Sequence, residues 1–267
     1  MTISLYGWPK PLDQDKALQS QGGPAGLKFS IVIPTLNQAD TLEDTLLSIV
    51  SQDYPHYEII VMDGGSTDNT AKVIAKYKDF ISHYTSGRDG GQSQAINKGF
   101  MKASGSVYAW INSDDYYLPG AFHEVVKKFD EDDNIDVVVG GGCIVTSDSQ
   151  FLKHIDGMEM IRENLLQWHK DKWIMQQSCF WKSGIWKKCG GVDLNLRRLM
   201  DFDLWLRFSD VGKSAVTDQD LAVMRYYPEA KSVSPKSIVR EEEAYVYAKN
   251  RELDEVMRVV REIMEES

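Results

Sequence analysis

The sequence predicts an α/β protein with a doubly wound, mostly parallel sheet flanked by helices. Three observations predict this fold class. Short apolar runs of strand length recur between residues 29 and 145, amphipathic segments separate them, and polar clusters follow three of the runs. Strands that alternate with helices are typical of parallel sheets, which bind ligands beyond the carboxyl ends of their strands.

Composition narrows the class of protein further. The chain has 267 residues, 42% hydrophobic and 26% charged, as in ordinary globular proteins. Its formal net charge of -10 argues against a nucleic-acid partner, which needs a positive surface. Three cysteines without a CxxC pair favour a reduced setting, and no apolar run approaches the roughly 20 residues that span a bilayer. We therefore expect a cytoplasmic protein without a transmembrane segment, whose only membrane contact would be peripheral, at the inner face of the cell membrane.

The first 50 residues predict an extension, a strand and a helix, in that order. Residues 1–28 are punctuated by glycine and proline and predict an extension without regular structure. Residues 29–34 form an apolar run closed by proline, which predicts a buried strand. An amphipathic helix should follow to residue 50, and Asp40 and Glu43 have the spacing of a capping box at its start.

The same alternation continues to residue 145, and the second half of the chain is less regular. Residues 236–267 carry an apolar stripe at helical spacing and predict a C-terminal amphipathic helix. It should pack on the body or on a second subunit, because its acid-rich opposite face disfavours anionic lipids. The other expected elements are strands at 57–63, 80–84, 106–112 and 136–145, and helices at 68–78, near 95–100 and at 119–129.

Two neighbouring carboxylates, Asp114 and Asp115, follow the apolar run VYAWIN directly. Adjacent carboxylates repel each other unless a cation or hydrogen bonds compensate. A hard divalent cation with oxygen ligands would compensate and would bridge to phosphates. The alternative is a solvated turn that caps the helix expected near Pro119.

Asp63 ends the second expected strand and precedes a GGSTD turn. Ser66 and Asp68 can cap the next helix, whereas a carboxylate at the position of Asp63 can accept a base imide N–H or a ribose hydroxyl. The chain contains neither GxGxxG nor a P-loop, so phosphate charge should be met by a metal ion rather than by lysine.

Asp201 and Asp203 open an apolar helix in MDFDLWLRF. The helix dipole favours the ionised form of a carboxylate in a first turn, which suits a general base. The alternative is helix capping, and position alone does not say which of the two aspartates would cap.

Four motifs in this order resemble the family 2 glycosyltransferases, which have the GT-A fold. The resemblance runs from residue 29 to residue 231, about three quarters of the chain. It implies transfer of a single sugar from a nucleotide donor to a hydroxyl with inversion, since the QxxRW motif and the membrane helices of processive relatives are absent. The motifs are SIVIPTLNQADTLEDTLLSIVSQDYPHYEIIVMDGGSTDNT, GRDGGQSQAINKGF, WINSDD and QQSCFWKSGIWKKCGGVDLNLRRLMDFDLWLRF.

The resemblance also implies a domain organisation. Residues 29–235 would form the GT-A domain, with a nucleotide-binding half at 29–115 and an acceptor-binding half at 116–235. The C-terminal helix would be an extension of this domain.

The resemblance assigns roles by position. Asp115 would be the metal ligand for Mn²⁺ or Mg²⁺, with Asp114 near the ribose and the metal, and Asp201 would be the catalytic base. Asp63 would hold the base, usually uracil. The other residues implied to line the nucleotide pocket are Pro34, Thr35, Asn37 and Asp89. The residues implied on the donor-sugar or acceptor side are Trp181, Gln176, Arg225 and Lys231.

Two positions depart from the family pattern. Met200 stands where many relatives have glutamate, and Tyr227 stands near a histidine of many relatives. Arg225 or Lys231 could face the phosphate instead. Trp181 could stack on a sugar ring, or it could be a core aromatic residue.

The implied partners are a nucleotide-sugar donor, most often a UDP-sugar, and a saccharide or lipid-linked saccharide acceptor. A homodimer through the C-terminal helix is a further expectation.

Two other classes of protein are alternatives to a glycosyltransferase. A sugar nucleotidyltransferase would need a Gly-rich basic loop after the first strand, which PTLNQAD is not. A non-catalytic nucleotide-sugar or glycan-binding module would have no need to retain Asp201.

Overall fold

The computed structural model describes residues 26–167, 172–227 and 236–266. The expected N-terminal extension therefore lies almost wholly outside the described residues, and so does Lys231.

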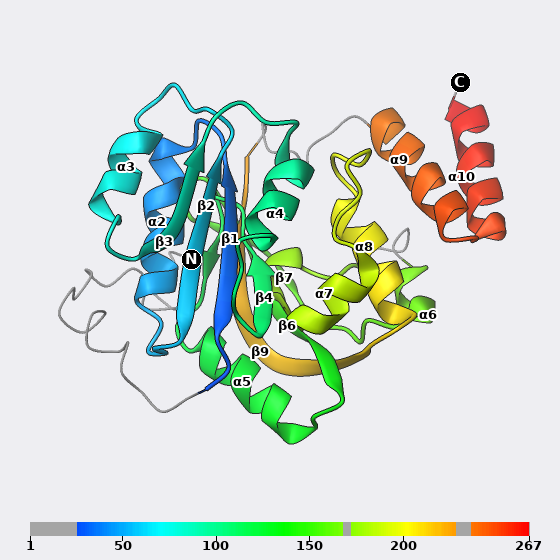
Figure 1. Cartoon of the computed structure of the whole chain (residues 1–267). Helices are drawn as coiled ribbons and strands as arrows, with labels where there is room; N and C mark the ends of the chain where they lie inside the picture. The colour runs from blue at the N-terminus through cyan, green and yellow to red at the C-terminus, as the bar shows by residue number, and fades with distance from the viewer. Residues whose placement is uncertain (1–25, 168–171, 228–235, 267) are drawn as a thin grey trace.

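The first half of the chain forms the parallel part of one sheet (Figure 1). Its spatial order is β3-β2-β1-β4, and each neighbouring pair is parallel. The strands run from the lower edge of Figure 1 to the upper one, so their carboxyl ends meet at the top. These strands are β1 (Phe29–Thr35), β2 (Tyr57–Asp63), β3 (Ile81–Ser86) and β4 (Val107–Trp110). The helices between them are α2 (Ala39–Val50), α3 (Thr70–Lys76) and α4 (Gln92–Phe100).

The central strand β1 is buried on both faces, which explains its mostly apolar sequence. Ile31 and Ile33 pack into the core cluster that contains α2 residues, whereas Val32 packs into the cluster with α4. Successive side chains of a strand point to opposite faces, so this alternation places helices on both sides of the sheet. A side chain at Gly99 of α4 would lie 2.5 Å from Val32, so only glycine allows this close approach of helix and strand.

The second half completes the sheet with mixed strand directions. The expected strand at 136–145 is present as β6 (Ile135–Thr146), but β8 (Cys179–Lys182) lies between it and β4 and is antiparallel to both. The long strand β9 (Lys213–Tyr226) runs parallel to β6. The remaining elements are β5 (Tyr116–Tyr117), α5 (Ala121–Glu131), β7 (Phe151–Ile155), α6 (Arg162–Leu165), the 3₁₀ turn η4 (Gln176–Ser178), α7 (Ser183–Cys189) and α8 (Met200–Ser209).

The C-terminal segment is two helices rather than the single helix expected. α9 (Lys236–Lys249) and α10 (Leu253–Glu266) form a hairpin beside α8 (Figure 1). Arg251 adopts a left-handed conformation with φ of 65°, and the Glu252 N–H donates to the Tyr247 carbonyl at 2.8 Å. This bond closes the end of α9, as in a Schellman motif, and a non-glycine residue in that position gave no signal in the sequence. Within the described residues, no helix has the length and apolarity needed to cross a bilayer.

The capping box expected at Asp40 and Glu43 is wrong. α2 begins one residue before Asp40, and the Ala39 N–H donates at 3.0 Å to Asp68, which follows β2. The other carboxylate oxygen of Asp68 accepts the Thr70 N–H at 3.0 Å, at the start of α3. Asp68 therefore joins the starts of both helices and holds together the loops after β1 and β2.

Candidate active site

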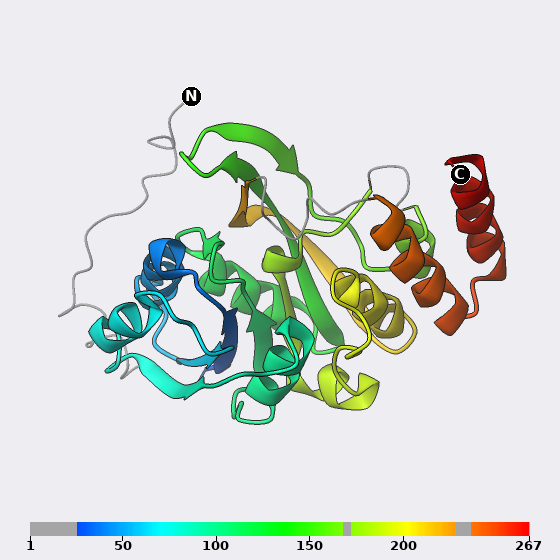
Figure 2. The same ribbon diagram turned by 90° about the horizontal axis from the view of Figure 1, so that it is seen from above.

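The loops after β1 and β2 are tied to each other at the carboxyl edge of the sheet, which Figure 2 shows from above. The Asn37 N–H donates to Ser66 Oγ, and the Thr67 N–H donates to Asn37 Oδ1, each at 2.8 Å. Asn37 has a φ of 53°, which asparagine tolerates better than most residues. The Gly64 N–H donates to the Thr35 carbonyl at 2.9 Å, so the two strand ends stay in register beyond the sheet.

Asp63 is buried at the end of β2 and accepts hydrogen bonds on both oxygens. Oδ1 accepts from the Ser66 N–H at 2.9 Å and the Ser66 hydroxyl at 2.6 Å, and Oδ2 accepts from Ser86 at 2.6 Å. Burial acts to raise the pKa of Asp63, but these hydrogen bonds outweigh it and lower the pKa below its usual value. Asp63 is therefore an ionised carboxylate that shapes the turn after β2.

Thr35 and Asp89 lie at the same edge. The Thr35 hydroxyl is buried and has no hydrogen-bond partner among the described residues. Asp89 Oδ1 accepts the Gly91 N–H at 2.8 Å, and a Cβ on Gly64 would lie 3.5 Å from the same oxygen. Pro34 is next to Thr35 in β1 and is paired in register with Met62 of β2. The residues expected to line a nucleotide pocket are thus brought together by the three parallel strands.

Asp115 faces the protein rather than solvent. It is 2% exposed, and its carboxylate accepts from Gln177 Nε2 at 2.5 Å, the Arg225 N–H at 3.0 Å and Asn112 Nδ2 at 3.2 Å. Burial, together with the negative charge of Asp114, raises the pKa of Asp115. Three protein donors already use this carboxylate, so the geometry does not favour Asp115 as the first metal ligand.

Asp114 is the more open carboxylate of the pair. Its Oδ2 accepts the Tyr227 hydroxyl at 2.6 Å, and Gln38 Nε2 donates to Tyr227 at 3.3 Å. Burial and the bond to Asp114 raise the pKa of Tyr227, so its hydroxyl stays protonated and donates. Tyr227 thus orients Asp114 from the end of β9.

Arg225 holds the loop that contains both aspartates. The side chain is buried, its Nη1 donates to the Asp114 carbonyl at 3.1 Å, its Nη2 pairs with Asp44 of α2, and its guanidinium lies 4.9 Å from the Tyr116 ring centroid. In this arrangement Arg225 positions the protein's own backbone, and its charge is already paired.

The residues around Asp114 fit a divalent cation that a substrate shares. Among the described residues, no cluster of three His, Cys, Asp or Glu could hold a metal ion by itself. Mg²⁺ is commonly bound by one or two carboxylates together with substrate phosphates. Tyr227 is the only donor to the Asp114 carboxylate in the described part of the chain, so one oxygen is left for a cation.

Asp201 and Asp203 of α8 have different surroundings. Asp203 is fully buried and pairs with Arg207 at 2.7 Å and with Lys249 of α9 at 3.0 Å. Asp201 has no cationic partner among the described residues. Burial raises its pKa to about 6, and Glu242 of α9 adds to the rise, against the hydrogen bond from the Phe202 N–H. The expected effect of the helix dipole is therefore outweighed, yet Asp201 is still ionised near neutrality, as a general base must be.

One chain of contacts connects the Asp201 turn to the aspartate pair. Separately, burial and the charge of Asp201 raise the pKa of the Cys179 thiol, two residues after Gln177, which donates to Asp115. The contacts run through the first turn of α4. Gln92 donates to Asn112 at 2.6 Å, and the hydroxyl of Ser93 contacts the Leu196 carbonyl at 2.6 Å and Met200 Sδ at 3.3 Å.

The structure corrects the assignment of Trp181 to the acceptor side. Trp181 is 0% exposed and packs against Trp110, Trp186 and Trp205, with ring centroids 5.3 to 6.0 Å apart. It is a core aromatic residue beneath the site. Gln176 is also buried, and its Nε2 donates to the Trp110 carbonyl at 2.9 Å. Its Oε1 has no partner among the described residues.

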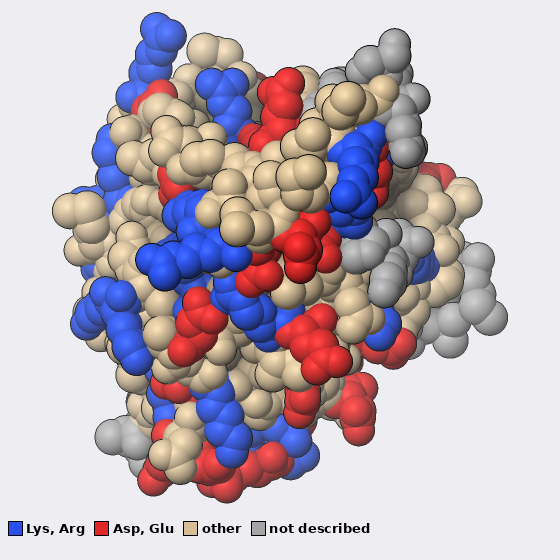
Figure 3. Space-filling model, turned by 90° about the vertical axis from the view of Figure 1, so that its right-hand side faces the viewer, with Lys and Arg blue, Asp and Glu red and all other residues tan. Residues whose placement is uncertain are grey.

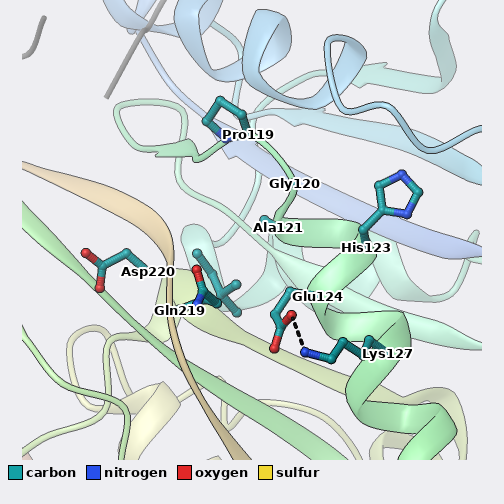
Figure 4. Close-up of a pocket in the computed structure, with 9 residues that line it drawn as sticks. Pro119, Gly120, Ala121, His123, Glu124, Lys127, Gln219 and Asp220 are labelled. Carbon is teal, nitrogen blue, oxygen red and sulfur yellow. Dashed lines mark hydrogen bonds and ion pairs between the residues drawn. The ribbon is translucent and has the colours of Figure 1, made fainter. Parts of the chain in front are cut away.

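A separate pocket lies away from these residues. It has a volume of about 260 Å³ and is formed by the start of α5 and the part of β9 around Gln219 (Figure 4). Lys127 in its wall pairs with Glu124 at 3.4 Å. None of the residues expected at the site lines this pocket.

Several residues of the site were missed by reasoning from the sequence. Asn112 and Gln177 both donate to Asp115. They lie in the WINSDD motif and in the motif that begins QQSCFW, so the available signal was a polar residue next to an apolar strand. Gln38 follows Asn37 in the first loop and offered the same signal. Glu242 is more than 40 positions from Asp201 in the sequence, and no local pattern indicates their proximity.

Comparisons with known proteins agree with this geometry. Residues 30–188, more than half of the chain, match the family described as "Glycosyl transferase family 2". An uncharacterized glycosyltransferase of Rickettsia typhi is 28% identical over 188 residues, covering 68% of this chain and 59% of its own. The putative glycosyltransferase TagX of Staphylococcus aureus is 31% identical over 146 residues, covering 52% of this chain and 40% of its own. The chain thus spans less than two thirds of these relatives.

Solved structures share the fold at low sequence identity. S. aureus TarS 1-349 in complex with UDP-GlcNAc aligns with a TM-score of 0.65 and 17% identity, over 83% of this chain and 66% of its own. The mannosyltransferase PcManGT from Pyrobaculum calidifontis, in complex with GDP-Man and Mn²⁺, aligns with a TM-score of 0.60 and 16% identity, over 88% and 68%.

An α/β sheet with this order, carrying carboxylates along the carboxyl edge of its parallel strands, defines the class of GT-A proteins, and the expected fold is confirmed. The chain belongs to glycosyltransferase family 2.

Proposed function

We propose that the protein transfers a single sugar from a nucleoside diphosphate sugar to a hydroxyl of a saccharide or lipid-linked acceptor, with inversion. One observation carries the proposal: the first turn of α4 connects the turn of Asp201, whose pKa is about 6, to the Asp114–Asp115 pair. An ionised base and a cation-binding carboxylate are what a single displacement on a sugar diphosphate requires.

In the proposed reaction the Asp201 carboxylate removes the proton of the acceptor hydroxyl. The hydroxyl oxygen then attacks the anomeric carbon, and the bond from that carbon to the diphosphate oxygen breaks on the opposite face. The bonding electrons leave with the nucleoside diphosphate, so no covalent sugar–enzyme intermediate is needed. The high pKa of Asp201 suits this step, because a more acidic carboxylate would be a weaker base.

The same proposal assigns a divalent cation, Mn²⁺ or Mg²⁺, to Asp114. When bound, such an ion would offset the negative charge that develops on the departing diphosphate. Asp114 replaces Asp115 as the proposed first ligand, since Asp115 already accepts three protein hydrogen bonds. Asp115 would support the ion by fixing the loop that carries Asp114.

We assign the nucleoside to the edge formed by β1, β2 and β3. The Thr35 hydroxyl is buried and unpartnered among the described residues, so it could bond a ligand without breaking an internal contact. Asp63 is an ionised acceptor beside it, and Pro34, Asn37 and Asp89 complete the edge. The complex of TarS with UDP-GlcNAc supports a uridine donor as the first choice, and that of PcManGT with GDP-Man keeps guanosine as the second.

Location and assembly are also proposals. We expect the protein to act in the cytoplasm, with peripheral contact when the acceptor is lipid-linked. On the described part of the face that carries α9 and α10, acidic and basic side chains are interspersed rather than gathered into one basic patch (Figure 3). The exposed apolar residues of α10 are better suited to contact with a second copy of the chain than to a membrane surface.

The test is ligand binding by the full chain. Unfolding is followed by thermal shift with UDP-GlcNAc, UDP-glucose, GDP-mannose and their free nucleotides, each with Mn²⁺, with Mg²⁺ or with EDTA. A preferred donor at about 100 times its Kd should stabilise the fold by about 2.7 kcal/mol through linkage, and only when metal is present. Absence of any shift, with any nucleotide and metal, would remove the proposed function. A shift that persists in EDTA would remove the metal assignment alone.

A further inference from the structure

The turn before α8 is held by a residue from the far end of the chain. The first N–H groups of a helix have no partners within it and need acceptors from elsewhere. Within α8, the Asp201 carboxylate accepts one such group, the Phe202 N–H, at 2.8 Å. In the turn before the helix, the N–H groups of Arg197, Arg198 and Leu199 donate to the carboxylate of Glu242 on α9, at 3.1, 2.9 and 3.0 Å.

Three consecutive N–H groups around one carboxylate form a fixed anion-binding concavity. Here the anion is supplied by the protein itself. Leu199 directly precedes α8, and Asp201 lies in the first turn of that helix. The position of the Asp201 carboxylate therefore depends on a turn that Glu242 holds.

Glu242 is itself held in place, because α9 is docked on α8. Lys249 pairs with Asp203 of α8 at 3.0 Å and with Asp193 at 2.7 Å. Tyr247 is fully buried, and its ring lies 5.7 Å from that of Phe202 in an edge-to-face contact. These contacts fix the helix that carries Glu242 against the helix that carries Asp201.

We propose that Glu242 is a positioning residue for the base Asp201, so that the C-terminal hairpin is part of the active site. The inference rests on the proposed role of Asp201. The segment that matches the family ends at residue 188, so α8 and α9 both lie beyond it. Glu242 also adds a negative charge near Asp201. Among the described residues, the other titratable group that interacts with Asp201 is Cys179 at the start of β8.

The experiment compares Glu242→Ala, Glu242→Gln and Glu241→Gln in the full chain. Glu241 is the matched control, because it is exposed and has no hydrogen bond or ion pair among the described residues. Glu242→Ala should lower kcat at least 10-fold while donor Kd, measured by calorimetry, changes less than 3-fold. Glu242→Gln keeps one acceptor oxygen, so its kcat should fall less than that of Glu242→Ala.

Glu242→Gln should also move the acidic limb of the pH profile of kcat/KM to lower pH, because removing a neighbouring negative charge lowers the pKa of Asp201. Glu241→Gln should match wild type.

Structural readouts keep the proposal testable without turnover. Hydrogen exchange at the amides of Arg197 to Leu199 should be at least 10-fold faster in Glu242→Ala than in Glu241→Gln. Unchanged kcat and unchanged exchange in Glu242→Ala would overturn the proposal. If that variant does not fold, an acidic limb in Glu242→Gln identical to wild type would overturn it instead. Failure of the proposed function looks different, since wild type would then neither bind nor turn over any donor.

Discussion

At the scale of single residues, Asp201 and Asp203 lie in the same helical turn but differ in their charged neighbours. Asp203 is compensated by Arg207 and Lys249 and joins two helices. Asp201 lies in the same turn with no cationic partner among the described residues, and burial raises its pKa to about 6. A carboxylate left uncompensated in this way costs stability, and such groups are concentrated at functional sites. The surroundings of Asp203 thus give it a structural role, whereas those of Asp201 suit the reactive role that we propose for it.

Asp201→Asn should abolish transfer and leave donor binding intact. Loss of a general base typically costs about 10²–10⁴-fold in rate, and asparagine is nearly isosteric with aspartate. Turnover is measured with the donor that shifts the melting temperature most, and donor Kd is measured by calorimetry. Turnover within 3-fold of wild type would exclude Asp201 as the base.

The same substitution should stabilise the folded protein above pH 6. The pKa of Asp201 is about 6 when folded and about 3.9 when unfolded, so the folded state holds a proton that the unfolded state releases. That contribution is fully present below pH 4 and lost as pH rises through 6. Asp201→Asn should therefore raise stability by about 1–3 kcal/mol at pH 7.5, and by little at pH 4. Denaturant unfolding at the two pH values checks the sign, and a variant less stable than wild type at pH 7.5 would contradict it.

Tyr227→Phe should weaken cation binding by about 10–100-fold, as loss of a hydrogen bond to a metal ligand commonly does. Tyr227 donates to Asp114 at 2.6 Å, and the phenylalanine ring keeps the packing without the donor. Mn²⁺ binding in the presence of UDP is followed by electron paramagnetic resonance, independently of turnover. Tyr226→Phe is the control, since Tyr226 is the exposed neighbour on the same strand. Equal Mn²⁺ affinity in both variants would show that Tyr227 does not orient the ligand.

At the scale of elements, the first half of the fold could be predicted from sequence because its signals are local. Each of its central strands is an unbroken apolar run, and each helix has an amphipathic pattern within about a dozen residues. The carboxyl ends of parallel strands must meet at one edge, so the gathering of Thr35, Asp63 and Asp115 followed from topology.

The second half was less predictable because its pairings are long-range. β8 is only four residues long, yet it lies between β4 and β6 and sets their separation. β9 places Arg225 and Tyr227 beside Asp115 and Asp114, which are about 110 positions away in the chain. Local periodicity contains no information about such pairs. For the same reason the sequence left open whether Trp181 faces a sugar or the core.

At the scale of the whole molecule, the net charge of -10 works against an anionic donor. Arg225, the buried cation beside the aspartate pair, does not offset it, since it is committed to Asp44 and to the Asp114 carbonyl. A local cation on Asp114 would meet the diphosphate where Arg225 does not. Binding that depends on metal is therefore the expected behaviour of this molecule.

The outer face of α10 carries the exposed apolar residues on which the proposed homodimer depends. Leu253, Met257, Val260 and Met264 are 71%, 52%, 38% and 73% exposed, and their spacing of 4, 3 and 4 is that of a coiled-coil seam. The inner face of α10 is occupied by α9, through buried Val259 and the Arg258–Glu243 pair. Asp254 and Arg261 border the seam near opposite ends. In an antiparallel two-fold pairing, Asp254 of each copy would face Arg261 of the other copy. The surface is therefore complementary to itself in shape and charge.

We therefore expect a homodimer, whose mass is measured by light scattering on the full chain. Met257→Glu should give a monomer, whereas Met101→Glu, at a residue 85% exposed on another surface, should not. Arg261→Asp should weaken the dimer, because it places acidic residues opposite each other. Adding Asp254→Arg should restore it, since the charges are then complementary again, and membrane insertion would not produce this rescue. A wild-type chain that stays monomeric at 100 µM, or one that binds phosphatidylglycerol vesicles through Met257 instead, would exclude the dimer.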